Sequence, residues 1–291
     1  MSTLESKHNI YSPQELLTPS HFDVDSIPKC VKPSTMTMDL STSVSLCLPN
    51  IFNVMPSLIG DPKYGIDYVQ YGSKWCGKSR KKKKEKNFHK SLSIEMTVSN
   101  TSPAVSNEVP VVRENISNGS LKLSTNGNIQ LSGCRNIHAA NVFLNRILNL
   151  LRARYFLIEG KMESLYEGDE IVPTKLKINM INTNGVLGHK INLDELYRQM
   201  LADSTISKEQ ISRPNDRVTL LYRTESHTTS IFLFHTGSYM ITGGKNHIHI
   251  RGAFEFMMGI IEPIRSSILL PDEDVIDCVA MSEEFKHLET M

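Results

Sequence analysis

Hydrophobic and polar residues along this chain follow the same series of patterns twice. Between positions 92 and 98, apolar residues alternate with polar ones, which is typical of a half-buried strand. Residues 121–133 then read as a strand, a tight turn at Gly127 and a second strand. In residues 136–154, apolar positions recur three and four apart, which predicts an amphipathic helix.

This strand-turn-strand-helix series recurs 110 residues later. Residues 231–243 again read as a strand, a glycine turn and a strand, with Gly237 at the position of Gly127. Residues 246–266 then form a second long helix with one apolar face. Because the two hairpins keep their register over 13 positions without an insertion, the pattern indicates an internal duplication.

Further elements precede each hairpin. In the second half, we expect a strand at 176–183, a helix at 191–201 and a strand at 217–225. In the first half, weaker patterns predict a strand at 36–42 and a helical segment at 50–58. Each half therefore reads β-α-β-β-β-α. We predict an α+β fold of two such repeats, each with an antiparallel sheet that helices cover on one face.

The domain boundaries follow from changes in composition. The first 34 residues mix Ser, Pro, His and acidic residues without periodicity, so we expect a flexible tail. The expected order is the tail at 1–34, a first repeat at 35–155 with a basic insertion at 74–90 and a polar loop at 100–118, a second repeat at 172–267 and an acidic tail at 270–291.

Charge is unevenly placed along the chain. The net charge is only +1, yet residues 74–90 hold nine Lys or Arg against one Glu, a local +8. Residues 271–291 hold seven Asp or Glu against one Lys, a local −6. The small net charge therefore does not exclude a nucleic-acid partner. The basic run is either a phosphate contact, a solvated loop or a localisation signal.

Several classes of protein are disfavoured by what the chain does not contain. No apolar run approaches 18 residues, and the N-terminus carries no secretory signal. The five cysteines are widely spaced without a CxxC motif, and the ten histidines show no metal-ligand spacing. Nucleotide P-loop, esterase and metalloprotease motifs do not occur. We expect no membrane segment, no cofactor or metal, no small-molecule substrate and no enzymatic activity.

The alternation assigns one face of the second sheet to the helices and leaves the other face open. The open face holds large apolar side chains, which is unfavourable unless something covers them. Phe232 and Phe234 are the informative residues, because they are either buried on both sides in a sandwich or form a binding platform. The full open-face set is Asn179, Ile181, Arg217, Leu221, Arg223, Phe232, Phe234, Met240 and Thr242.

Three segments of the second half resemble the TATA-box-binding protein (TBP) family. The family's LIYR strand is matched by RVTLLYRTE at 217–225, its LIFxSGKxxxTGAK hairpin by IFLFHTGSYMITGGK at 231–245, and the helix that follows by GAFEFMMGII at 252–261. The first half matches in outline, through NGNIQLSGCR at 126–135. Its divergence and basic insertion resemble the TBP-like proteins of large nucleocytoplasmic DNA viruses.

The resemblance implies a saddle whose concave sheet binds the DNA minor groove and whose convex face carries the helices. The minor groove presents mainly acceptors at A·T pairs, so apolar and amide groups read its width and deformability. Phe side chains wedge into base steps and bend the duplex, a mechanism for which this family is itself the standard example.

Carried onto this chain, the resemblance makes Phe234 a wedge and Asn179 the amide that donates to base acceptors. Arg223 is expected to reach a phosphate, and the other wedge position holds Arg217. The remaining groove-lining positions are Phe232, Met240 and Thr242.

The first repeat departs from this pattern. Its residues at the positions of Phe232, Phe234, Met240 and Thr242 are Lys122, Ser124, Gln130 and Ser132. The position of Asn179 holds Asp39, whose carboxylate would be repelled by groove acceptors. We therefore expect an asymmetric clamp in which the second repeat lines the groove. Phosphates would be held by Lys122 and by the run Arg80, Lys81, Lys82, Lys83 and Lys84.

The expected function is that of a general transcription initiation factor, which binds promoter DNA in the minor groove and recruits the transcription machinery. Its expected protein partners are a B-type general transcription factor, RNA polymerase or both, bound by the convex helices and the acidic tail. The alternative is a TBP-fold interaction scaffold that has lost DNA binding. The expected location is the host cytoplasm (a viral factory) or the virion for a viral protein, and otherwise the nucleus.

Overall fold

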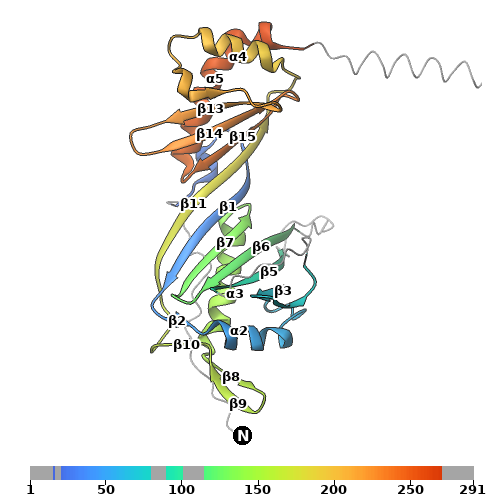
Figure 1. Ribbon diagram of the computed structural model, residues 1–291, viewed down its shortest axis with the longest axis vertical. Helices are drawn as coiled ribbons and strands as arrows, with labels where there is room; N and C mark the ends of the chain where they lie inside the picture. Colours follow the sequence, from blue (N-terminus) through green and yellow to red (C-terminus); the bar gives the residue numbers. More distant parts are fainter. Residues whose placement is uncertain (1–15, 17–20, 80–89, 101–114, 271–291) are drawn as a thin grey trace, which may run out of the picture. The chain divides into compact units, whose positions relative to one another are not determined.

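The computed structural model describes residues 16, 21–79, 90–100 and 115–270 (Figure 1). These residues divide into two compact units. The first unit takes the residues up to Val24 and then Pro33–Ile181, and the second takes Asp25–Lys32 and the residues from Asn182 onward. Strand β11 (Pro173–Val186) crosses the boundary and contributes to both.

The second unit contains an antiparallel sheet in the order β12-β13-β14-β15-β11. Helices α4 and α5 pack on one face of this sheet (Figure 1). Alternate residues of β13 to β15 point to that face and are buried, among them Leu220, Leu233 and Ile241. The elements after β11 are α4 (Leu193–Ala202), η3 (Lys208–Gln210), β12 (Ile211–Ser212), β13 (Arg217–Arg223), β14 (Thr228–Phe234), β15 (Ser238–Gly244) and α5 (His247–Ile268).

The first unit contains a sheet in the order β11-β1-β7-β6-β5-β3-β4. Helices α2 and α3 pack on one face of it, and Phe143 of α3 is fully buried there. The short helix η1 (Val24–Ser26) spans the boundary between the two units. The elements that follow it, up to β11, are β1 (Lys32–Thr42), β2 (Ser45–Leu46), α2 (Leu48–Val54), η2 (Met55–Ser57), β3 (Ile66–Tyr71), β4 (Lys74–Gly77), β5 (Ser91–Asn100), β6 (Asn115–Ser124), β7 (Asn128–Cys134), α3 (Ile137–Arg152), β8 (Tyr155–Ile158), β9 (Lys161–Ser164) and β10 (Tyr166–Glu167).

The backbone repeats the duplication seen in the sequence. Gly127 and Gly237 have φ angles of 79° and 74°, a left-handed conformation that glycine adopts without a steric penalty. The pairing in the two hairpins is also equivalent, because Lys122 faces Gln130 as Phe232 faces Met240.

The two long helices begin in the same way. The side chain of Asn136 accepts a hydrogen bond from the backbone N–H of Ala139 at 2.7 Å, and Asn246 accepts one from His249 at 2.9 Å. An asparagine at this position satisfies one of the N–H groups that a helix leaves unpaired at its start. The prediction of an α+β fold with helices on one face of an antiparallel sheet is confirmed.

The flexible tail expected at 1–34 is wrong for its second part. Residues 21–34 are placed in the structure, and Phe22, Ile27 and Val31 are buried. These apolar side chains lie singly in irregular segments before and after the short 3-10 helix Val24–Ser26, so they leave no periodic signal. Strand β1 also begins four residues before the expected Met36.

Two boundaries in the first half also need correction. The basic insertion expected at 74–90 begins with strand β4 (Lys74–Gly77), which pairs with the unforeseen strand β3. The polar loop expected at 100–118 ends before Asn115, because β6 pairs with β5 over ten residues. Hydrogen bonds to β5 hold the Asn, Ser and Gly residues of β6 in a strand, although these residue types have a low β-propensity.

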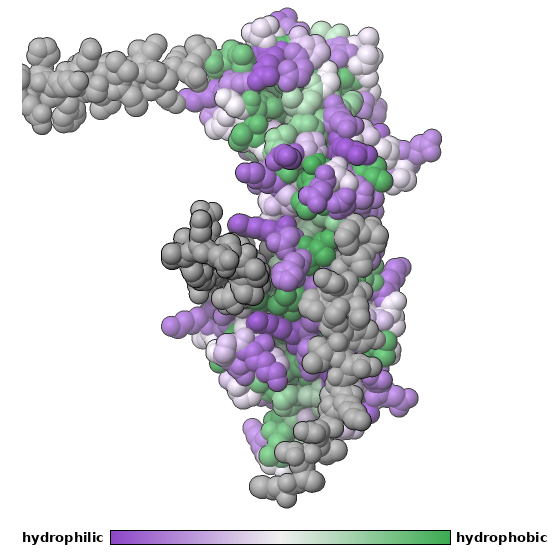
Figure 2. All heavy atoms as spheres, turned by 180° about the vertical axis from the view of Figure 1, so that it is seen from behind, coloured by the Kyte–Doolittle hydropathy of each residue, from purple (hydrophilic) through white to green (hydrophobic). Residues whose placement is uncertain are grey.

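The surface of the described residues is mixed in character. Figure 2, drawn from the opposite side to Figure 1, shows hydrophilic and hydrophobic residues interspersed. In the described part of the chain, each helix lacks the combination of length and apolar character that crossing a bilayer requires. Exposed apolar side chains include Trp75 on β4 and Leu157 and Met162 on the β8–β9 hairpin.

Candidate nucleic-acid interface

The sheet face opposite α4 and α5 is the candidate interface of the second unit. Residues that pair across antiparallel strands share a face, so Thr219, Phe232 and Met240 form one row on this side. Phe232, Phe234 and Met240 are all partly exposed, while Leu233 between the two phenylalanines is fully buried. The alternative that this strand is buried on both sides is therefore wrong.

Arg217 lies over the ring of Phe232, with 4.7 Å from its guanidinium carbon to the ring centroid. It occupies the position that pairs with Phe234, at the start of β13. An Arg on an aromatic face is held by attraction to the ring and by contact of its planar group. The Asp216 carboxylate is 3.5 Å from the Arg217 guanidinium, but the Asp216 side chain is 67% exposed and that of Arg217 is partly exposed, so this ion pair contributes little.

Thr242 and Asn182 form the polar part of the same face. The Thr242 hydroxyl donates a hydrogen bond of 2.5 Å to the amide oxygen of Asn182. The sequence placed Ile181 on the open face instead, and the structure corrects this, because Ile181 is fully buried. Strand β11 buries Ile178 and Ile181, three residues apart, so it breaks the alternation that the sequence assignment assumed.

Leu221 and Arg223 complete the predicted set on β13. Leu221 is partly exposed and pairs with Ser230, and Arg223 is exposed at the strand end and pairs with Thr228. Both therefore lie on the open face as expected. The backbone oxygen of Leu221 also accepts a hydrogen bond from Gln210, which fixes the end of the short η3–β12 segment against β13.

The corresponding face of the first unit is polar. Lys122 and Gln130 form a pair, as do Ser120 and Ser132, and Ser124 pairs with Ser91. Lys122 is exposed and the four predicted residues Lys122, Ser124, Gln130 and Ser132 all lie on the sheet face opposite α3. The sequence assignment of these positions therefore agrees with the strand register.

Asp39 lies at the centre of a hydrogen-bonded group on this polar face. Its Oδ1 accepts a hydrogen bond from Gln130 Nε2 at 3.2 Å, and its Oδ2 accepts one from Asn179 Nδ2 at 2.6 Å. Asn179 belongs to the first unit, not to the second as its place in the sequence suggested. One of its two amide hydrogens is therefore directed at Asp39.

An aromatic pair on β3 and β4 was missed in the sequence. Tyr68 and Trp75 are stacked, with ring centroids 6.5 Å apart and an interplanar angle of 26°. Burial, followed by the Glu95 carboxylate, raises the pKa of the Tyr68 phenol, which therefore stays protonated at neutral pH. The strand-glycine-strand pattern of IDYVQYGSKW, with Gly72 in the turn, is the signal that could have revealed this hairpin.

The basic run Arg80, Lys81, Lys82, Lys83 and Lys84 lies outside the described residues, as does the acidic tail from residue 271. Within the described part, no group of three or more His, Cys, Asp or Glu side chains is assembled as a metal site would require.

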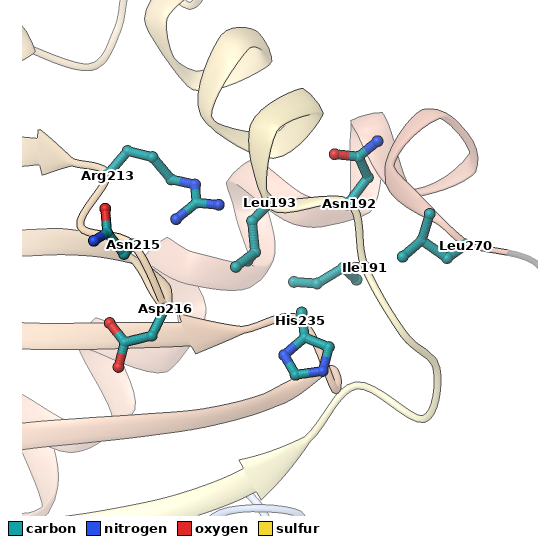
Figure 3. Close-up of a pocket in the computed structure, with 8 residues that line it drawn as sticks. All are labelled: Ile191, Asn192, Leu193, Arg213, Asn215, Asp216, His235 and Leu270. Carbon is teal, nitrogen blue, oxygen red and sulfur yellow. The ribbon is translucent and has the colours of Figure 1, made fainter.

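A pocket of about 380 Å³ lies in the second unit near the start of α4 (Figure 3). Arg213 enters it from the segment before β13, and Asp216 and His235 also line it. The Arg213 guanidinium donates to the backbone oxygens of Pro214 and Arg217, and pairs with Asp194 at 3.1 Å. This arginine holds the loop before β13 against α4, which is a structural role.

Comparisons with known proteins agree on one family. Residues 175–264, from β11 into α5, match the family described as transcription factor TFIID or TATA-binding protein (TBP). A TATA-box-binding protein-like protein of Acanthamoeba polyphaga mimivirus is 27% identical over 197 residues, covering 63% of this chain and 50% of that relative. The second repeat of this chain, from β11 into α5, is therefore similar to the TBP family. The chain spans about half the length of this curated relative.

Among solved structures, the TBP of Methanococcus jannaschii matches this chain with a TM-score of 0.46 and 14% sequence identity. The match covers 80% of this chain and 98% of the archaeal one. The family match spans the elements that carry Phe232, Phe234 and Met240, whereas the strands of the first sheet, β11 excepted, lie before it.

Proposed function

We propose that this TBP-like protein binds duplex DNA through the open faces of its sheets and acts as a transcription initiation factor. The second unit inserts its apolar face into the minor groove, and the first unit contacts the same duplex through polar and basic groups. The observation that carries the proposal is the partial exposure of Phe232, Phe234 and Met240 on a sheet face opposite the helices. Folding alone gives no reason to keep large apolar side chains there.

The chemistry of this face fits a minor groove. Apolar side chains can wedge into base steps and unstack them, and Arg217 above Phe232 supplies a cation beside the apolar surface. The Thr242 hydroxyl donates its proton to Asn182 beside it, and the side-chain N–H groups of Asn182 are of the donor type that the acceptors of A·T pairs require. This is a binding role, and the proposal assigns no catalytic step to any residue.

The protein partners are proposed for the helices on the opposite faces. Helices α3 and α5 pack on the sheets with one side and present the other, and α5 exposes Ile248 near its start. A B-type general transcription factor or RNA polymerase would bind there, while DNA occupies the sheet. For a viral protein we place this activity in the host cytoplasm or the virion.

The test is DNA binding by the full chain with and without the two phenylalanines. We expect wild type to bind labelled A·T-rich duplexes, with an affinity that falls steeply as salt rises. The double variant Phe232→Ala/Phe234→Ala should weaken binding at least about tenfold and reduce DNA bending, measured by energy transfer between labelled duplex ends. Ile248→Ala on α5 serves as the matched control, because it removes an exposed apolar side chain away from the sheet.

A scaffold that has lost DNA binding is the competing function, and one observation favours it. The Asp39 carboxylate lies on the face where a groove would present its own acceptors. If wild type fails to bind duplex DNA even at low salt, the scaffold is the better description. Unchanged affinity and bending in the double phenylalanine variant would also overturn the minor-groove proposal.

A further inference from the structure

The first unit carries an aromatic side chain on the sheet face where the sequence indicated only polar groups. Trp75 on β4 is 50% exposed, and it stacks on Tyr68, which is 5% exposed. Tyr68 forms a rigid base for the tryptophan ring, because burial fixes it and stacking aligns the two rings. A large aromatic ring held in this way on a surface is typical of a contact for another molecule.

The strand pairing places Trp75 on the same face as the predicted DNA contacts of the first unit. Residues that pair directly in antiparallel strands project to the same side of the sheet. The row runs from Trp75 to Gln70, from Gln70 to Ser93, from Ser93 to Lys122, from Lys122 to Gln130 and from Gln130 to Asp39. Lys122 in this row occupies the position that Phe232 holds in the second unit.

Charges around this row favour an anion. Lys122 is exposed in the row itself, and Lys78 is exposed just beyond the end of β4. The acidic groups on the face are engaged within the protein, since Glu95 accepts a hydrogen bond from Ser79 and Asp39 accepts two. A sheet face with an aromatic ring on its outermost strand and a lysine three strands away can contact the sugars or bases of a nucleic acid through the ring and phosphates through the lysine.

We propose that Trp75 is an apolar contact of the bound DNA, which replaces in the first unit the phenylalanine contacts that Lys122 and Ser124 lack. It acts from an added strand, β4, beyond the position that corresponds to β12 in the second unit. Each unit then has an apolar contact with the DNA. In the second unit this contact lies on the hairpin strand β14, whereas in the first unit it lies on β4, which has no counterpart in the second unit. This inference rests on the proposed DNA-binding function.

The chain offers a direct readout, because Trp75 is its only tryptophan. Intrinsic fluorescence therefore reports on this ring alone. We expect titration with duplex DNA to change the tryptophan emission saturably, with the midpoint that anisotropy of labelled DNA gives. Trp75→Ala should weaken the affinity about tenfold, as loss of an aromatic contact with a nucleotide does, and Trp75→Phe should restore most of it.

Leu157→Ala is the matched control, because Leu157 is 70% exposed in the same unit but on the β8–β9 hairpin outside the sheet. It should leave the affinity unchanged. Thermal unfolding of Trp75→Ala checks that the fold is retained, and we expect it to be, since Trp75 is 50% exposed.

The outcomes separate this inference from the proposed function. If wild type binds DNA but Trp75→Ala binds equally well, the inference is overturned and the DNA-binding proposal stands. DNA binding without any change in tryptophan emission overturns the inference in the same way. If wild type binds no duplex DNA at low salt, both fail together. A loss of affinity in Trp75→Ala that Trp75→Phe does not restore would point to a disturbed fold and would also count against the inference.

Discussion

Replacing Asp39 with asparagine tests whether the polar face of the first unit lies against DNA. The substitution exchanges one carboxylate oxygen for an NH2 group, and we expect it to lower the stability of the fold and to raise the affinity for DNA. The side chain keeps its shape and loses its negative charge. Asp39 Oδ1 and Oδ2 accept hydrogen bonds from Gln130 and Asn179 at 3.2 and 2.6 Å. Asparagine can accept only one of these bonds, and its own amide then faces another amide as donor to donor.

The expected cost in stability follows from the lost bond. A hydrogen bond to a charged group contributes about 1.5–3 kcal/mol when buried, and this site is partly exposed, so we expect about 1–2 kcal/mol. That corresponds to a fall in the melting temperature of roughly 3–6 °C for a chain of this size. Differential scanning fluorimetry measures it.

We expect the Asp39→Asn substitution to increase the affinity for DNA. A carboxylate about 10 Å from a phosphate is repelled by roughly 0.4 kcal/mol in water, and two or three phosphates lie at such distances from a groove-facing residue. Removal of the charge should therefore contribute about 1 kcal/mol, or about a fivefold tighter affinity, before any new hydrogen bond to a base. Fluorescence anisotropy with a labelled duplex measures this gain.

A charge-matched control isolates the position of Asp39 from the change in net charge. Glu167→Gln removes one exposed acidic group on β10, outside the large sheet, and should alter the affinity by less than about twofold. If the Asp39→Asn variant stays folded but binds DNA no better than wild type, the sheet face of the first unit does not lie against DNA.

Two further predictions concern the fold. Gly237→Ala should lower the melting temperature far more than Gly188→Ala. The new Cβ at position 237 would collide with the backbone oxygen of His189, whereas at position 188 it would meet no atom within 4 Å and only the left-handed φ is unfavourable. Equal losses in melting temperature would contradict this reasoning. Burial, followed by the charge of His227, lowers the pKa of His249, so its contribution to stability is present above pH 6.5 and is lost as the pH falls through the lowered value. Wild type should therefore lose more stability between about pH 7 and pH 5 than His249→Gln, and superimposable pH profiles from urea unfolding would refute it.

The second hairpin and its helix could be predicted closely from the sequence, because each element there follows one regular period. Phe232 and Phe234 alternate with Leu233 as the pattern requires, and α5 begins one residue after the predicted start. The prediction was wrong for Ile181, because β11 changes phase between Ile178 and Ile181. Such a change depends on the neighbouring strands, and one strand's own sequence does not encode it.

The first unit was predicted less completely, for a different physical reason. The residues of β3 and β4 include Tyr68 and Trp75 in a regular hairpin, but β4 opens a segment whose charge count is dominated by lysine and arginine. The net charge of residues 74–90 is a property of the whole segment, and it gives no sign of the four-residue strand β4 at its start. The Asp39–Asn179 hydrogen bond joins positions 140 residues apart, and only the fold brings these two side chains together.

A comparison of the two hairpins distinguishes the residue pairs that folding requires from those that it does not require. On the helix-facing side the pairs Leu121–Leu131 and Ile231–Ile241 are equivalent and buried in both units, since each core must exclude water. On the open side, the pair in the second unit is Phe232–Met240 and that in the first is Lys122–Gln130. The first unit shows that the same backbone forms with a polar pair there, so the apolar pair of the second unit is not needed for the fold. Its partial exposure is a cost that a bound partner would offset, and the variants above measure that partner's contribution.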